Sequence, residues 1–71
     1  MDLKKRFASE LKAIGTPEVI TVATRLPSGN IRVTTVTENT VAEANYYLEF
    51  YDDNFRAKNN ENVQILGYML I

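Results

Sequence analysis

Five of the seven aromatic residues in this 71-residue chain fall within ten consecutive positions. The segment that carries them has helical periodicity, and neighbouring residues of a helix project about 100° apart, so the rings leave it on different sides. A chain of this length has room for one small hydrophobic core. We therefore expect some rings to enter the core and others to face away from it. The five are Tyr46, Tyr47, Phe50, Tyr51 and Phe55.

The composition excludes several classes of protein. Hydrophobic residues make up 45% of the chain and charged residues 24%, which favours a globular domain over disorder. There is no cysteine and no histidine, so disulfide frameworks and thiolate zinc sites are excluded. No apolar run approaches the roughly 18 residues that cross a bilayer, and the basic N-terminal residues are not followed by the apolar part of a signal peptide. We expect a cytoplasmic protein with no cofactor, no metal and no membrane segment.

Two helices are predicted. The first covers residues 3–14, where apolar residues recur every three or four positions, with Asp2 as its N-cap and Gly15 at its end. The second begins near Asn39 or Thr40 and ends between residues 53 and 58. Its predicted core-facing stripe is Val41, Ala44, Leu48, Tyr51 and Phe55.

Three strands are predicted. Residues 18–38 are rich in β-branched side chains on either side of a turn at residues 27–30, which is typical of a β-hairpin. Residues 63–71 form a last strand that is apolar on both faces, as in an inner strand. The sequence therefore predicts a single α-β-β-α-β domain over residues 1–71, of the α/β (α+β) class. Its two helices would cover one face of a three-stranded sheet in a two-layer sandwich, with strand order 2-1-3.

The second helix carries the first candidate site. Tyr46 and Phe50 lie four residues apart, opposite the core-facing stripe, and Tyr47 is predicted on a flank. Exposed aromatic rings are common and need no function, but a pair of them also suits a protein contact, since aromatic rings bring a large apolar area at low entropic cost. Acidic residues would surround the rings, which suits a partner with basic and apolar side chains. The predicted partner-binding residues are Glu43, Tyr46, Tyr47, Glu49, Phe50 and Asp53.

The uncovered face of the sheet is the second candidate. We predict a hairpin register in which Leu26 pairs with Ile31, because it separates apolar from polar residues best. A bare face of mixed character either is covered by self-association or faces water. In this register the uncovered face would carry Thr21, Ala23, Arg25, Arg32, Thr34, Val36, Leu66 and Tyr68.

Charge is unevenly distributed along the chain although its net value is −1. Residues 1–37 contain six basic and three acidic side chains, and the remainder contains two basic and six acidic ones. This leaves a weak nucleic-acid-binding regulatory module as an alternative, although the aromatic residues lie in the acidic half, unlike those of most nucleic-acid binders. Its contacts would be Lys4, Lys5, Arg6, Arg25 and Arg32.

No pattern in the chain indicates catalysis. Its serines have no histidine to activate them, and glycine-rich phosphate loops are absent. We expect a non-enzymatic protein-interaction or regulatory domain that binds a protein partner and forms a homo-oligomer. In its brevity and its lack of cysteine and histidine the chain also resembles the small accessory proteins common in phage and other mobile-element genomes, which implies a host-modulating role as a further alternative.

Overall fold

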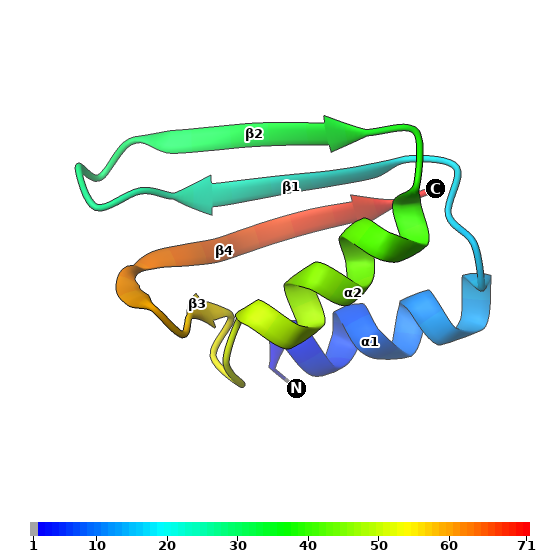
Figure 1. Cartoon of the computed structure of the whole chain (residues 1–71), viewed down its shortest axis with the longest axis horizontal. Coiled ribbons are helices and arrows are strands. Elements are labelled where there is room, and N and C mark those ends of the chain that lie inside the picture. The colour runs from blue at the N-terminus through cyan, green and yellow to red at the C-terminus, as the bar shows by residue number, and fades with distance from the viewer. Residues whose placement is uncertain (1) are drawn as a thin grey trace.

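The computed structural model describes residues 2–71 (Figure 1). It has two helices on one side of a four-stranded antiparallel sheet with strand order β2-β1-β4-β3. The predicted α+β class is confirmed, and so is the placement of the first strand between the second and the last. The predicted three-stranded sheet lacked one short strand. The elements are α1 (Leu3–Ile14), β1 (Ile20–Arg25), β2 (Ile31–Val36), α2 (Thr40–Phe50), β3 (Arg56–Ala57) and β4 (Asn60–Leu70).

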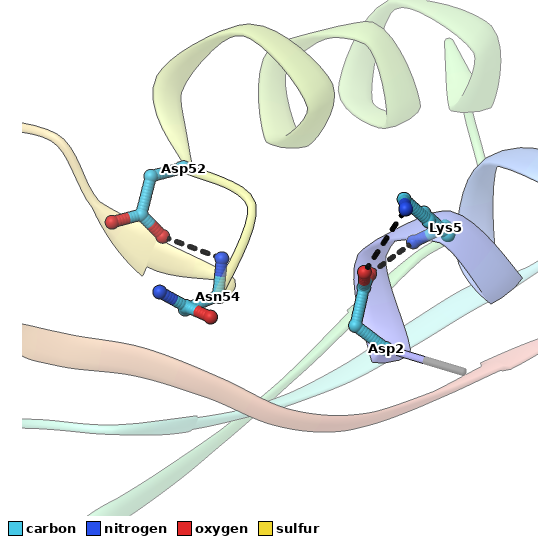
Figure 2. Close-up of polar contacts among 4 residues, drawn as sticks. All are labelled: Asp2, Lys5, Asp52 and Asn54. Carbon is cyan, nitrogen blue, oxygen red and sulfur yellow. Dashed lines mark hydrogen bonds and ion pairs between the residues drawn. The ribbon is translucent and has the colours of Figure 1, made fainter.

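The ends of α1 are those that the sequence predicts. The Asp2 carboxylate accepts a hydrogen bond from the backbone N–H of Lys5 at 2.8 Å, and Figure 2 shows this contact. It satisfies one of the N–H groups that lack a partner within the helix. At the other end, Gly15 has φ 82°, a conformation that glycine adopts without steric cost, and its N–H bonds to the Leu11 carbonyl.

The end of α2 differs from the prediction. The helix stops at Phe50, and Tyr51 is already extended. The Asp52 carboxylate then accepts hydrogen bonds from the backbone N–H groups of Asn54 (2.9 Å, Figure 2) and Arg56 (3.0 Å), which closes a tight turn. The side chains of Asp and Asn often accept hydrogen bonds from nearby backbone N–H groups in this way, and these bonds take the place of the helical ones. The turn leads directly into β3, so a segment expected to be helix and loop contributes an edge strand instead.

The hairpin register is shifted by one residue from the prediction. Ile31 pairs with Arg25 rather than with Leu26, because the loop contains three residues and not four. The N–H of Leu26 donates to the Asn30 carbonyl at 2.8 Å, which closes the loop, and Gly29 supplies the positive φ of 91° that such loops require. A shift of one residue moves every β2 side chain to the opposite face.

A β-bulge explains why β4 is apolar on both faces. Ala23 pairs with Gly67 and Thr24 with Ile65, so Leu66 is an extra residue in β4. The bulge reverses the alternation of side chains at this point. As a result Ile65 and Tyr68 both face the helices, although the sequence alone places them on opposite faces.

The core lies between the sheet and the two helices and is largely aromatic. Phe7 of α1 is fully buried at its centre, and three other rings meet it edge-on at centroid distances of 5.0 to 6.3 Å, an arrangement that aromatic quadrupoles favour. These rings come from α2, from the turn after it and from β4. The buried hydrophobic residues are Phe7, Ile20, Val22, Ala44, Tyr47, Tyr51, Phe55 and Ile65.

Candidate interaction surface

The helix α2 is rotated from its predicted phase by less than the angle of about 100° between neighbouring residues, because Ala44, Tyr51 and Phe55 of the predicted stripe are buried as expected. Its buried positions are Thr40, Ala44 and Tyr47, followed by Tyr51 just beyond its end. Val41, predicted in the core, is 41% exposed, and Leu48 is only partly buried. The Thr40 hydroxyl donates to the Pro17 carbonyl at 2.5 Å. This bond satisfies a hydroxyl that would be costly to bury without a partner, so a threonine occupies a core position that the apolar pattern assigned to valine.

Tyr47 is a core residue and not a flank residue, which corrects its predicted role as a partner-binding anchor. Its side chain is only 5% exposed and its ring meets that of Phe7. Its hydroxyl donates to the Glu43 carboxylate at 2.6 Å. Burial, and then this hydrogen bond, raise the pKa of Tyr47 above its ordinary value. A partner therefore has little access to the ring unless the core opens.

Tyr46 and Phe50 point outward, as predicted. They are 44% and 51% exposed, and their ring centroids lie 4.7 Å apart on successive turns of α2. We call this pair the aromatic surface. A single exposed ring on a small protein needs no explanation, whereas two neighbouring rings in contact form a contiguous apolar area of the kind found at protein contacts.

The aromatic surface is supported from beneath by buried rings. The ring centroids of Tyr46 and Tyr51 lie 6.4 Å apart, with an interplanar angle of 84°. The ring centroids of Tyr51 and Phe55 lie 6.1 Å apart, also in an edge-on arrangement. A continuous series of aromatic contacts therefore runs from the surface into the core. Such packing restricts the rotamers of Tyr46, which lowers the entropy lost when a partner binds to it.

Acidic side chains surround the aromatic surface only in part. Glu49 is exposed on α2 next to Phe50. Asp53 is also exposed, but it lies in the turn after the helix, so helical periodicity does not place it. Glu43 is half-buried and its carboxylate is bonded to Tyr47. Two of the three predicted acidic residues thus offer free carboxylates to a partner.

A basic residue lies nearer to the aromatic surface than the sequence suggested. Arg32 pairs with Thr24, a buried residue of β1, so it lies on the helix side of β2 rather than on the uncovered face. Burial raises the pKa of Tyr51, followed by the effect of Tyr46, and the positive charge of Arg32 opposes both. The predicted register hid this proximity, because it assigned Arg32 to the wrong face.

The uncovered face of the sheet is more apolar than predicted. The corrected register brings Ile31 and Val33 onto it, where they are 52% and 65% exposed. The bulge adds Met69 from β4, and Leu66 stays on this face as predicted; both are exposed. Four residues predicted on the uncovered face lie instead on the helix side of the sheet: Arg32, Thr34, Val36 and Tyr68. Thr21, Ala23 and Arg25 of β1 remain on it.

The predicted nucleic-acid contacts do not form one surface. On α1, the Lys5 ammonium lies 3.9 Å from Asp2, and Arg6 lies 3.4 Å from Glu10. Lys4 donates to a backbone carbonyl, that of Tyr51, at 2.5 Å. Arg25 and Arg32 project from opposite faces of the hairpin. Lys4, Lys5, Arg6 and also Arg25, which bonds to Gln64, therefore have partners within the chain, and the two hairpin arginines point apart.

A shallow cleft of about 480 Å³ lies beside the hairpin loop. Arg25 and Arg56 both line it. They lie on the two strands that flank β4, and in the sheet register each is opposite Gln64. The Arg25 guanidinium donates to the Gln64 side-chain oxygen at 2.5 Å. Glu61 also lines the cleft and offsets part of the positive charge. Arg56 was missed as a potential contact because its segment looked like the end of a helix.

A polar contact joins α1 to the sheet. The Tyr68 hydroxyl of β4 donates to the Glu10 carboxylate. This hydrogen bond lowers the pKa of Glu10, while burial and the same bond raise the pKa of Tyr68 to about 12. Together with Phe7 against the Tyr68 ring, the contact holds α1 on β4.

Comparisons with known proteins provide no family for this fold and surface. No protein-family model, no curated protein and no solved structure matches the chain. Within residues 2–71, no three side chains of the metal-binding kinds lie close enough to hold an ion together. None of the helices in the same range has the length and apolarity required to cross a membrane.

Proposed function

We propose that this chain is a small non-enzymatic interaction domain that binds a protein partner through the aromatic surface of α2. The observation that supports this most strongly is the half-exposed pair formed by Tyr46 and Phe50, whose rings are in contact. Aromatic residues that are rigidly held and exposed are typical of the few residues that dominate binding energy at protein interfaces. Self-association is part of the proposal and is treated separately below.

The charges around the aromatic surface define the partner that would fit it. Glu49 on α2 and Asp53 in the turn after the helix both carry exposed carboxylates. A partner with an apolar centre and one or more lysine or arginine side chains would bury the rings and pair with these carboxylates. Rim charges of this kind affect the association rate and its salt dependence more than the final affinity.

Nucleic-acid binding is the second candidate function. The observation in its favour is the pair Arg25 and Arg56 beside the cleft, since guanidinium groups form bidentate hydrogen bonds with phosphates. The contacts of Lys5 and Arg6 with acidic neighbours reduce the basic surface available to it. Binding to generic duplex DNA at low salt, lost steeply as salt rises and lost in Arg25→Ala, would support this function. No detectable binding at low salt would remove it.

A displayed library of random peptides tests the proposed protein contact. Selection against the wild-type protein should enrich peptides that combine apolar and basic residues. Their binding should fall at least tenfold on Phe50→Ala, because that change removes half of the aromatic surface. Val41→Ala is the matched control, since it also truncates an exposed apolar side chain of α2 but lies more than one turn from Tyr46.

Two outcomes would overturn the proposed function. One is that selected peptides bind Phe50→Ala as tightly as the wild type, so that they use another surface. The other is that Phe50→Ala unfolds the protein, which would make the ring a core residue. Circular dichroism of each variant separates loss of binding from loss of fold.

A further inference from the structure

The outer edge of β2 differs from the other edge of the sheet. β3, at one end, contains two residues, whereas β2, at the other end, contains six and lies away from the helices (Figure 1). Five of the six β2 residues are β-branched, and the strand contains no proline or lysine. Natural proteins usually protect a long edge strand with such residues or with a covering segment, because an edge attracts other strands. Among residues 2–71 nothing pairs with this edge.

The hairpin geometry shows which backbone groups of β2 are unpaired. Leu26 and Asn30 form a hydrogen-bonded pair at the loop. Hydrogen-bonded and non-hydrogen-bonded pairs alternate along an antiparallel ladder, so β2 uses the groups of Arg32, Thr34 and Val36 toward β1. The N–H and C=O groups of Ile31, Val33 and Thr35 therefore point away from the sheet.

We propose that two copies of this chain form a dimer through β2, in which the two sheets join as one antiparallel eight-stranded sheet. A twofold axis at Val33 places Val33 opposite its copy and Ile31 opposite Thr35 of the second copy. This register pairs every outward N–H and C=O of β2. It also joins the apolar uncovered faces of the two copies, since the side chains of Ile31 and Val33 lie on that face.

The charge of Arg32 selects this register over its neighbours. With the axis at Val33, Arg32 lies opposite Thr34 of the second copy. Moving the axis to position 32 would place two arginines directly opposite each other, and like charges in that position are destabilising. Moving it to position 34 would leave the outward groups of Ile31 without a partner inside β2. The net charge of −1 on each copy opposes association only weakly.

This dimer deepens the self-association included in the proposed function, and it uses different atoms from the aromatic surface. The two proposals therefore fail independently. Phe50→Ala should leave the dimer intact. If Phe50→Ala abolishes the dimer while changes in β2 do not, the second copy docks on α2 and the β2 proposal is overturned.

Solution mass is the first test. Light scattering across a dilution series should give about 16 kDa at high concentration, twice the 8.1 kDa of one chain. Val33→Pro should give the monomer mass, because proline removes an outward N–H that the isolated fold does not use. Val33→Thr is the matched control and should remain dimeric, since it keeps the backbone groups and the β-branched shape. A wild type that is monomeric throughout, or a Val33→Pro variant that stays dimeric, would overturn the proposal.

A crosslinking test covers the case in which Val33→Pro does not fold. The chain has no cysteine, so a single substitution gives one thiol per copy. Directly opposite residues in a hydrogen-bonded pair have Cα atoms about 5.5 Å apart, within disulfide range. Val33→Cys should therefore form an intermolecular disulfide rapidly under mild oxidation. Thr35→Cys, whose two copies would lie roughly 13 Å apart along the strands, should crosslink at least tenfold more slowly. Equal rates for the two variants would overturn the proposed register.

Discussion

Tyr46 and Tyr47 are neighbours in sequence, and the structure gives them opposite environments. Tyr47 is 5% exposed, hydrogen-bonded to Glu43 and packed on Phe7, whereas Tyr46 is 44% exposed and contacts the ring of Phe50. The two sides of α2 thus carry the same kind of side chain for different purposes. The buried side is explained by the stability of the fold, and the exposed side is the one that we propose binds a partner.

The largest expected effect comes from the buried side. Phe7→Ala should cost about 3 to 5 kcal/mol of unfolding free energy, because it leaves a cavity where three other rings meet. That is most of the stability of many small domains, so we expect a largely unfolded chain by circular dichroism. Phe7→Leu, as the control, should fold with a lower urea midpoint. An unchanged midpoint in Phe7→Ala would contradict the assigned core.

Stability should also fall at alkaline pH. Since folding raises the pKa of Tyr68 from about 10 to about 12, the folded state keeps a proton that the unfolded chain releases. The resulting stabilisation is fully present below pH 10 and is lost as the pH rises through about 12. Tyr47 and Tyr51, whose pKa values are also raised, add to this loss. Urea midpoints measured between pH 9 and pH 12 should decline, and less steeply in Tyr68→Phe.

A pair of single-atom changes sharpens the comparison between the two tyrosines. Tyr47→Phe removes the hydroxyl that donates to Glu43, and it should cost about 1 kcal/mol of unfolding free energy. Tyr46→Phe removes a hydroxyl on the exposed side and should cost less than about 0.5 kcal/mol. Equal losses, measured by urea unfolding at neutral pH, would show that the two sides of α2 do not differ as described.

A small effect on stability is also expected at Phe50. Phe50→Ala should change the unfolding free energy by about 0.5 kcal/mol, since half of the side chain is already in water. Its effect on peptide binding should be far larger. This separation between stability and binding is what distinguishes a contact residue from a core residue. A loss of several kcal/mol would place Phe50 with Phe7 instead.

The parts of the fold that local signals specify were predictable. Asp2 and Gly15 define the ends of α1 because capping depends on adjacent backbone groups. The β-branched residues on either side of a turn define the hairpin. The crossover rule predicted that the last strand runs parallel to the second, and the simplest placement of that strand, beside the first, gave the order of the three long strands.

The errors in the sheet arose at two places where one additional or one missing residue reverses the face to which the following side chains point. Counting Asn30 as a loop residue shifted the hairpin register, and with it the face assigned to Arg32. The extra residue Leu66 reverses the faces of β4, and no periodic pattern reveals a bulge in advance. The available sequence signal for a three-residue loop was the glycine at position 29, because the last residue of such a loop has a positive φ, which glycine adopts readily.

In the candidate site, the exposed positions of Tyr46 and Phe50 were predictable, but the position of Tyr47 was not. The outward direction of Tyr46 and Phe50 followed from helical spacing. Tyr47 was misplaced because the apolar pattern fits two helical phases that differ by less than one residue position. The hydrogen bonds of Thr40 and Tyr47 favour the phase that was not predicted. Hydrogen bonds across the core decide such cases, and they depend on tertiary structure.

The exposure of the aromatic surface can be measured directly with Phe50→Trp. The chain contains no tryptophan, so the substituted residue would be its single indole fluorophore. We predict emission close to that of tryptophan in water, strong quenching by acrylamide, and loss of that quenching when a selected peptide binds. Blue-shifted emission that acrylamide does not quench in the free protein would place the ring in the interior and contradict the account.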